Sequence, residues 1–138
     1  MAFIEEHDLW TETQRQAAAD VRRRIEAGGI ELVRLSFPDL HGILRGKALL
    51  PAAILGALTE GCAITSSLLF NDTSHRTVIP VFAPGAGVGN ARLQGASDIV
   101  MVPDPTTFRL LPWLPSTGWM LCDVYFPDGS PVEFAPRH

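Results

Sequence analysis

The chain has 138 residues, enough for one domain with its own hydrophobic core and too few for two. Its composition is 46% hydrophobic and 19% charged, which is typical of a globular protein and excludes a disordered chain. Eleven Lys and Arg against fifteen Asp and Glu give a formal net charge of −4. This balance argues against a nucleic-acid partner, because phosphate contacts need a basic surface.

The first half of the chain predicts a helix, a hairpin and a second helix. Thr11 and Gln14 fit a capping box that begins a helix over 11–27, with Arg22–Arg24 on its solvated side. Pro51 and Gly61 mark the beginning and the end of the second helix. The hairpin strands between the two helices are predicted over 30–37 and 43–49.

The second half predicts strands and turns with little helix. Strands are expected over 62–70, 98–102 and 119–126, with a short edge strand over 78–82. The stretch 84–95 is a loop rich in Gly and Ala, and a loop of this length is usually either functional or disordered.

Cysteine and hydropathy patterns point to a cytoplasmic protein with no membrane partner. Cys62 and Cys122 are too few for a disulfide framework and are expected to be reduced core residues. The N-terminus has acidic residues where a secretion signal needs a basic region, and the longest uncharged run, 77–91, is too short to span a membrane.

Arg45 and Lys47 share one face of the second hairpin strand. Two cations that project together suit an anion contact, and they equally suit a solvated strand edge protected by charge. Both readings stay open at this point.

Motifs for catalysis are missing. Gly85, Gly87 and Gly89 lack the Gly-Lys-Ser/Thr and the helix of a nucleotide loop, and no serine lies in a nucleophile elbow. His and Cys spacings predict no metal site. By motif content, this chain is not a complete enzyme.

Three stretches in order resemble the glutamine synthetase family. Residues 37–47 contain the Asp-x-x-Gly-x-x-Arg-x-Lys pattern of its early hairpin, and residues 97–107 resemble its Pro-Asp-Pro-x-Thr strand and turn. The stretches 112–113, 121–131 and 136–137 resemble the segment that closes the family's N-terminal domain.

This resemblance implies an α+β fold, a β-grasp-like mixed sheet of four or five strands with one or two packed helices. Residues 1–29 would form an N-terminal helical segment and residues 30–138 the β-grasp domain. The catalytic domain that follows in the family is absent, so this chain itself would hold no cofactor, while the full-length enzyme would use ATP and Mg²⁺ or Mn²⁺. The implied partner is the catalytic domain of the same or a neighbouring subunit in a ring-shaped homo-oligomer.

The implied site holds the amine substrate, and here the sequence departs from the family. Thr65 aligns with an aspartate near the family's ammonium site, and a hydroxyl cannot supply that negative charge. Thr65, Ser66 and Asp72 are the candidate amine-site residues, with Asp72 a possible substitute for the aspartate. If the substrate is an organic amine, Phe70, Asp72 and His75 are candidates for an altered pocket; alternatively, residues 65–67 are ordinary strand residues.

The resemblance thus predicts the N-terminal domain of an ATP-dependent carboxylate–amine ligase that completes the active site of a neighbouring subunit. The isolated chain is expected to have no ligase activity. The alternative is a free-standing β-grasp interaction module without chemistry of its own.

Overall fold

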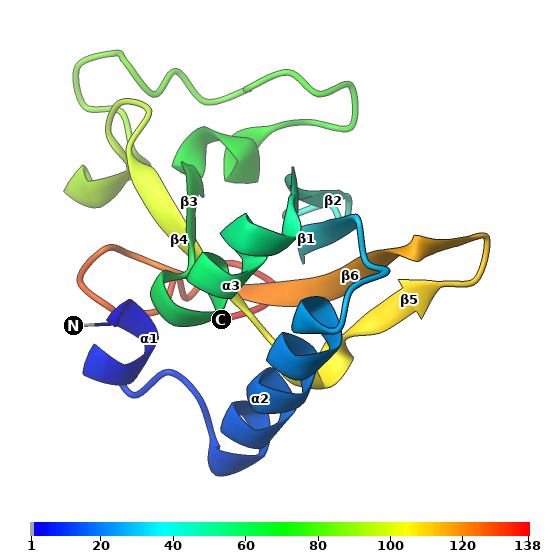
Figure 1. Ribbon diagram of the computed structural model, residues 1–138. Helices are drawn as coiled ribbons and strands as arrows, with labels where there is room; N and C mark the ends of the chain where they lie inside the picture. Colours follow the sequence, from blue (N-terminus) through cyan, green and yellow to red (C-terminus); the bar gives the residue numbers. More distant parts are fainter. Residues whose placement is uncertain (1) are drawn as a thin grey trace.

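A computed structural model describes residues 2–138 as a sheet with helices packed against it (Figure 1). The helices are α1 (Phe3–Glu6), α2 (Glu12–Glu26) and α3 (Pro51–Glu60). The strands are β1 (Leu32–Pro38), β2 (Leu44–Leu49), β3 (Cys62–Thr65), β4 (Asp98–Pro103), β5 (Arg109–Leu111) and β6 (Leu114–Tyr125). Short 3₁₀ helices occupy Ser66–Phe70 (η1), Ala91–Leu93 (η2) and Pro105–Thr107 (η3).

The six strands form one mixed sheet in the order β2-β1-β6-β4-β3, with β5 paired to β6. β1 runs parallel to β6, and the other pairs are antiparallel. This arrangement confirms the predicted α+β, β-grasp-like fold, with six strands in the sheet where four or five were expected.

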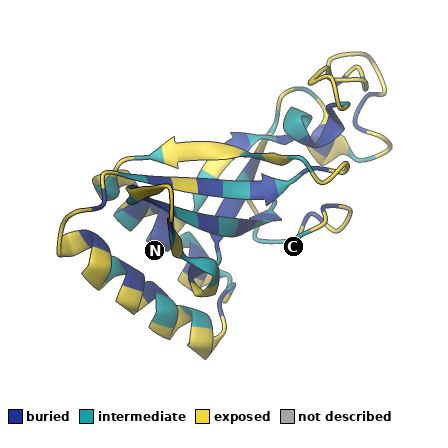
Figure 2. Ribbon diagram, turned by 90° about the vertical axis from the view of Figure 1, so that its right-hand side faces the viewer, coloured by how far each residue is buried: buried dark blue, intermediate teal, exposed yellow. Residues whose placement is uncertain are grey.

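The core lies between the sheet and the helices. Alternate residues of β1 and β6 are fully buried, as the period of two in a strand requires. They share one apolar cluster with α2 and α3, and Figure 2 shows exposed residues on the outer side of α2. The members from these four elements are Ala18, Val21, Ile25, Val33, Leu35, Phe37, Ile54, Ala57, Leu58, Met120, Cys122 and Val124.

The first helix begins as predicted and is fastened by a side chain that was expected to be solvated. Thr11 and Gln14 form both hydrogen bonds of the capping box. Arg22, however, donates from its guanidinium to the Leu55 carbonyl (3.2 Å), the Leu58 carbonyl (2.9 Å) and the Thr59 hydroxyl (2.7 Å). It thereby satisfies carbonyls in the last turns of α3, where a cation is also favoured by the helix dipole.

The sheet is curled, so that its two outer strands approach each other. β2 and β3 lie at opposite ends of the strand order, yet the Lys47 ammonium on β2 donates a hydrogen bond of 2.7 Å to the Ala63 carbonyl on β3. Arg45 and Lys47 lie opposite Phe37 and Leu35 in the β1–β2 register, so they project from the same face of the sheet, as predicted.

The predicted strand over 62–70 is wrong in its second half. β3 stops at Thr65, which pairs with Asp98, the first residue of β4, so the following residues have no strand to pair with. The Thr65 hydroxyl instead accepts from the Ser67 amide and begins η1.

Other boundaries differ as well. No strand forms over 78–82, where Pro80 lacks an amide donor. An isolated bridge between Asn71 and Thr77 precedes this stretch. β6 begins at Leu114, before the predicted residue 119, because β5 pairs with it as a hairpin. α1 and β5 were not predicted from the sequence.

Candidate functional site

The residues predicted to contact an amine lie where β3 passes into η1 and the segment 71–97. This segment projects from one end of the sheet and is largely exposed (Figures 1 and 2). Its backbone is held by a few defined contacts, described below, with Leu93 only 2% exposed.

Ser66 is fully buried and ties η1 to the end of the projecting segment. Its amide donates to the Ser97 carbonyl (2.8 Å), and its hydroxyl lies 3.0 Å from the Ser97 hydroxyl. Ser97 Oγ donates its proton to the Arg92 carbonyl (2.6 Å), so Ser66 Oγ must be the donor in the pair. The Ser66 proton is therefore committed within the protein, while the half-buried Thr65 lies next to it at the start of η1.

Asp72 closes a tight turn at the start of the segment. One carboxylate oxygen accepts from the Ser74 amide (2.8 Å) and the Arg76 amide (3.0 Å). In the described residues the second oxygen of Asp72 has no hydrogen-bond partner, which leaves it able to accept from a ligand.

Arg45 binds an anion that belongs to the chain itself. Its Nε donates to Asp39 Oδ2 (3.0 Å), and Asp39 also accepts from the amides of His41 (2.8 Å) and Ile43 (3.0 Å). Burial by itself raises the pKa of Asp39, but these donors hold the pKa below its ordinary value. Asp39 is thus a buried carboxylate that stays ionised.

The same arginine connects the hairpin to the projecting segment. Arg45 Nη1 lies 2.6 Å from His75 Nδ1. Because a guanidinium only donates, His75 Nδ1 must be the acceptor, which leaves the ring proton on Nε2. Arg45 Nη2 is buried without a partner among the described residues. The structure therefore brings Arg45 and the turn closed by Asp72 together, whereas Lys47 points to β3.

The structure also contains an apolar pocket of about 350 Å³. Its walls come from the turn after β1, η1, the projecting segment and the C-terminal segment. The lining residues are Leu40, Phe70, Ile79, Val88, Asn90, Leu93 and Phe134. The rings of Phe70 and Phe134 stack with their centroids 6.1 Å apart and an interplanar angle of 20°.

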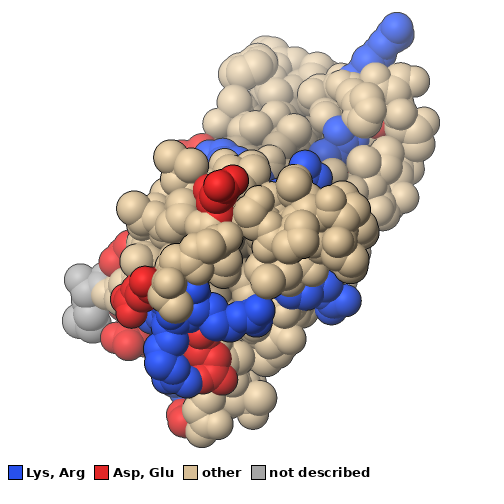
Figure 3. All heavy atoms as spheres, turned by 45° about the vertical axis from the view of Figure 1, so that its right-hand side comes forward, with Lys and Arg blue, Asp and Glu red and all other residues tan. Residues whose placement is uncertain are grey.

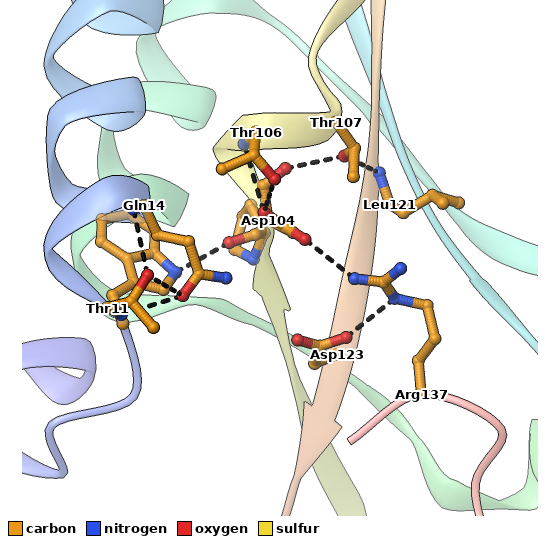
Figure 4. A network of polar contacts seen from close by, with 10 residues as sticks. Thr11, Gln14, Asp104, Thr106, Thr107, Leu121, Asp123 and Arg137 are labelled. Carbon is orange, nitrogen blue, oxygen red and sulfur yellow. Dashed lines mark hydrogen bonds and ion pairs between the residues drawn. The ribbon is translucent and has the colours of Figure 1, made fainter.

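The C-terminal segment is held against the sheet by an ion-pair network (Figure 4). Arg137 donates to Asp123 Oδ1 on β6 (2.8 Å) and to Asp104 Oδ2 (2.9 Å). Burial raises the pKa of Asp104, but hydrogen bonds, first of all from the Thr106 hydroxyl, hold it below its ordinary value. Residues of the two stretches that resemble the family's turn and closing segment therefore meet in one network.

Charges of both signs gather on the face seen in Figure 3, towards the end where α2 lies. Among residues 2–138, no three His, Cys, Asp or Glu side chains come together as a metal site. No helix in the described part of the chain is long and apolar enough to cross a membrane.

Comparison with known proteins identifies the family. The chain is 43% identical to γ-glutamylanilide synthase of an Acinetobacter species. The alignment covers 98% of this chain and 28% of that protein. It is 37% identical over 123 residues to glutamine synthetase of Mycobacterium tuberculosis, covering 86% of this chain and 23% of the relative. The solved structure of GmaS with ADP matches with a TM-score of 0.61 and 29% identity over 83% of this chain and 22% of that one.

The chain is an N-terminal domain of the glutamine synthetase family. No family model matches it. This glutamine synthetase-family domain spans about a quarter of the length of the relatives it matches.

Of the seven residues that line the pocket, the sequence pointed to Phe70 alone, and Thr65, Ser66 and Asp72 are not among them. The lining residues that were not predicted are Leu40, Ile79, Val88, Asn90, Leu93 and Phe134. One signal in the sequence could have indicated the pocket. Large apolar residues occur in the loop 71–97 at spacings that fit neither a helix nor a strand. Such residues in a long loop indicate either burial under the loop or a binding surface.

Proposed function

We propose that this domain belongs to a ligase that uses ATP to join the γ-carboxylate of glutamate to an organic amine. The observation that carries the proposal is the 43% identity to γ-glutamylanilide synthase over 98% of the chain. The alignment covers nearly the whole chain, so it includes the end of β3 and the projecting segment.

The reaction proceeds in two steps. The γ-carboxylate oxygen attacks the terminal phosphorus of ATP and ADP leaves, which gives γ-glutamyl phosphate. The amine lone pair then forms a bond to the acyl carbon, the bond from that carbon to the phosphate oxygen breaks, and the amine loses a proton. ATP and Mg²⁺ or Mn²⁺ are held by the catalytic domain, outside this chain.

This domain contributes the amine side of the site. In the proposal, residues 30–138 form the β-grasp domain, which completes the active site of a neighbouring subunit in a ring-shaped homo-oligomer, and residues 1–29 form a helical segment before it. Thr65 and the second carboxylate oxygen of Asp72 contact the amine. Ser66 positions η1 through its buried bond to Ser97.

The electrostatics of η1 favour an uncharged organic amine over ammonium. No acidic residue lies between Cys62 and Phe70, and the nearby Asp72 carboxylate already accepts from two backbone amides, so the attraction for a small cation is weakened. Thr65 offers only a neutral hydroxyl. A neutral amine needs no such charge.

The test is an amine screen on the native polypeptide that contains this sequence. We expect a polypeptide several times heavier than the 15.0 kDa chain, which releases phosphate from ATP when glutamate and an organic amine are both present. The separately expressed 1–138 chain is the control and should give no product. A higher rate with ammonium than with any organic amine contradicts the amine assignment, and a native mass of 15 kDa supports the free-standing module instead.

A further inference from the structure

We propose that the apolar pocket beside η1 binds the aromatic ring of the amine substrate, so that the ligase is selective for arylamines. This inference rests on the proposed function and names its substrate class. The pocket is defined by Leu40, Phe70, Ile79, Val88, Asn90, Leu93 and Phe134.

The pocket has the size and the lining of a site for one aromatic ring. Its volume is about 350 Å³. An apolar cavity of about 150 Å³ is already enough to bind benzene. A single ring therefore fits, and room remains at the mouth for the amino group.

Two stacked phenylalanines supply an aromatic wall. Phe70 is 5% exposed and fixed in the core, whereas Phe134 is 41% exposed and presents part of its ring to the open side. Aromatic rings attract one another in offset or edge-to-face arrangements by about 0.5–1.5 kcal/mol beyond the burial of their area. An aryl group can therefore extend the Phe70–Phe134 stack.

The charge of the pocket selects between classes of amine. The lining residues carry no charge, and the single polar side chain, Asn90, already accepts from the Arg92 amide (3.0 Å). An alkylammonium ion would lose its hydration there without gaining a counter-ion. An arylamine is neutral at pH 7, because its lone pair is delocalised into the ring, so it enters without that cost.

The position of the pocket matches the chemistry. Phe70 ends the 3₁₀ helix that begins beside Thr65, and Asp72 follows shortly after it. The pocket is thus connected along the chain, through Phe70, to the residues that the proposed function assigns to the amine.

The outer wall is held in place before any ligand binds. Ser97 Oγ donates to the Arg92 carbonyl, and the Arg92 guanidinium lies 3.9 Å above the Phe126 ring and donates to Ser130 Oγ (2.7 Å). These contacts fix the segment that carries Val88, Asn90 and Leu93. Because this wall is already ordered, ligand binding has a smaller entropic cost.

The test replaces a pocket leucine and a matched leucine outside it in the native polypeptide. Leu40→Trp fills the pocket, while Leu114→Trp makes the same change at a similarly exposed leucine on the β5–β6 hairpin (48% and 44% exposed). We expect Leu40→Trp to raise KM for aniline at least tenfold and to leave KM for methylamine unchanged. Leu114→Trp should change neither value.

Aniline binding measured by ligand-observed NMR gives a second readout that does not depend on turnover. We expect saturation transfer to aniline in the native polypeptide and its loss in Leu40→Trp. Phe134→Ala, at a partly exposed position, should weaken aniline binding at least fivefold if Leu40→Trp does not fold.

The outcomes separate the two proposals. A polypeptide that binds aniline in the pocket but makes no γ-glutamyl amide contradicts the proposed function alone. Equal changes in KM for aniline and methylamine overturn the aryl pocket, as does unchanged aniline binding in both pocket variants. The aryl pocket is also overturned if Leu40→Trp changes the mass of the oligomer and abolishes activity towards both amines, because the pocket is then a contact between subunits.

Discussion

Asp39 combines full burial with a negative charge, which is costly unless the charge is fully paired. The turn after β1 pairs it with two backbone amides and with the Arg45 guanidinium. Gly42 makes this turn possible, since it adopts a φ of 77° in the left-handed region. The hairpin that presents Leu40 to the pocket therefore depends on one ionised carboxylate.

Asp39→Asn is expected to destabilise the 1–138 chain by about 3 kcal/mol at pH 7, because it leaves Arg45 without its counter-ion. The pKa of Asp39 lies below its ordinary value of 3.8 in the folded chain, so its stabilisation is complete above that value and is lost as the pH falls through the folded pKa. Urea unfolding at several pH values should show that the difference in the free energy of unfolding between the unchanged chain and Asp39→Asn narrows below about pH 4, the ordinary range of a carboxyl pKa.

Asp128→Asn provides the control, since the Asp128–Arg92 pair is solvent-exposed and its loss should change the free energy of unfolding far less than Asp39→Asn does. Equal losses in the two variants, or a difference for Asp39→Asn that does not depend on pH, would contradict this account of the hairpin.

The role of Arg45 shows what residue patterns leave out. The sequence placed Arg45 and Lys47 on one face and left open an anion contact or a charged strand edge; in the structure Arg45 pairs with Asp39 of the same hairpin. The Arg45–Asp39 pair depends on the conformation of the turn 39–42, which brings Asp39 back towards β2. The alternation of residues along a strand does not predict that conformation.

At the scale of elements, Arg22 joins two helices that the sequence treats as separate. Arg22→Met keeps most of the aliphatic packing and removes the guanidinium, so α3 loses the donors at its last turns. We expect a loss of about 2 kcal/mol in the free energy of unfolding of the 1–138 chain, measured by urea denaturation.

The matched change is Arg23→Met, one residue along the same helix. Arg23 pairs only with the exposed Asp20 and is itself 70% exposed, so its loss should cost about 0.5 kcal/mol or less. If the two methionine variants are equally stable, Arg22 does not fasten α3.

Capping residues in the sequence predicted where the two longer helices begin. The Thr11–Gln14 capping box and Pro51 gave helix beginnings to within a residue, since capping is decided by the adjacent sequence. The end of β3 was missed because residues 66–70 are as apolar as a strand. The strand stops because its antiparallel partner β4 begins at Asp98, opposite Thr65, and this pairing is a tertiary contact.

At the scale of the whole molecule, the pocket could not be predicted from the sequence. Its walls come from the turn after β1, η1, the segment 71–97 and the C-terminal segment, which are far apart along the chain. Phe70 alone was named beforehand, as a candidate for an altered pocket if the substrate is an organic amine.

The C-terminal segment depends on Arg137, which bridges carboxylates on two parts of the sheet. Arg137→Gln leaves Asp104 and Asp123 without their shared cation, so the segment should open more often. We expect the Val132 amide, which donates to the Val124 carbonyl (3.2 Å), to exchange its proton at least tenfold faster.

Hydrogen exchange followed by NMR on the 1–138 chain measures this rate. Arg34→Gln, at an exposed arginine of β1, is the matched control and should leave the Val132 rate unchanged. An unchanged rate in Arg137→Gln would mean that apolar contacts, and not the ion pairs, hold the segment.

The strand order has a consequence for biosynthesis. β6 lies between β1 and β4 at the centre of the sheet, yet the ribosome makes it after every other strand. Until β6 emerges, β1 can pair only with β2. The apolar face of this hairpin and the apolar faces of α2 and α3 then lack the central strand of the sheet against which they pack. The nascent chain therefore stays exposed to aggregation until almost all 138 residues have been translated.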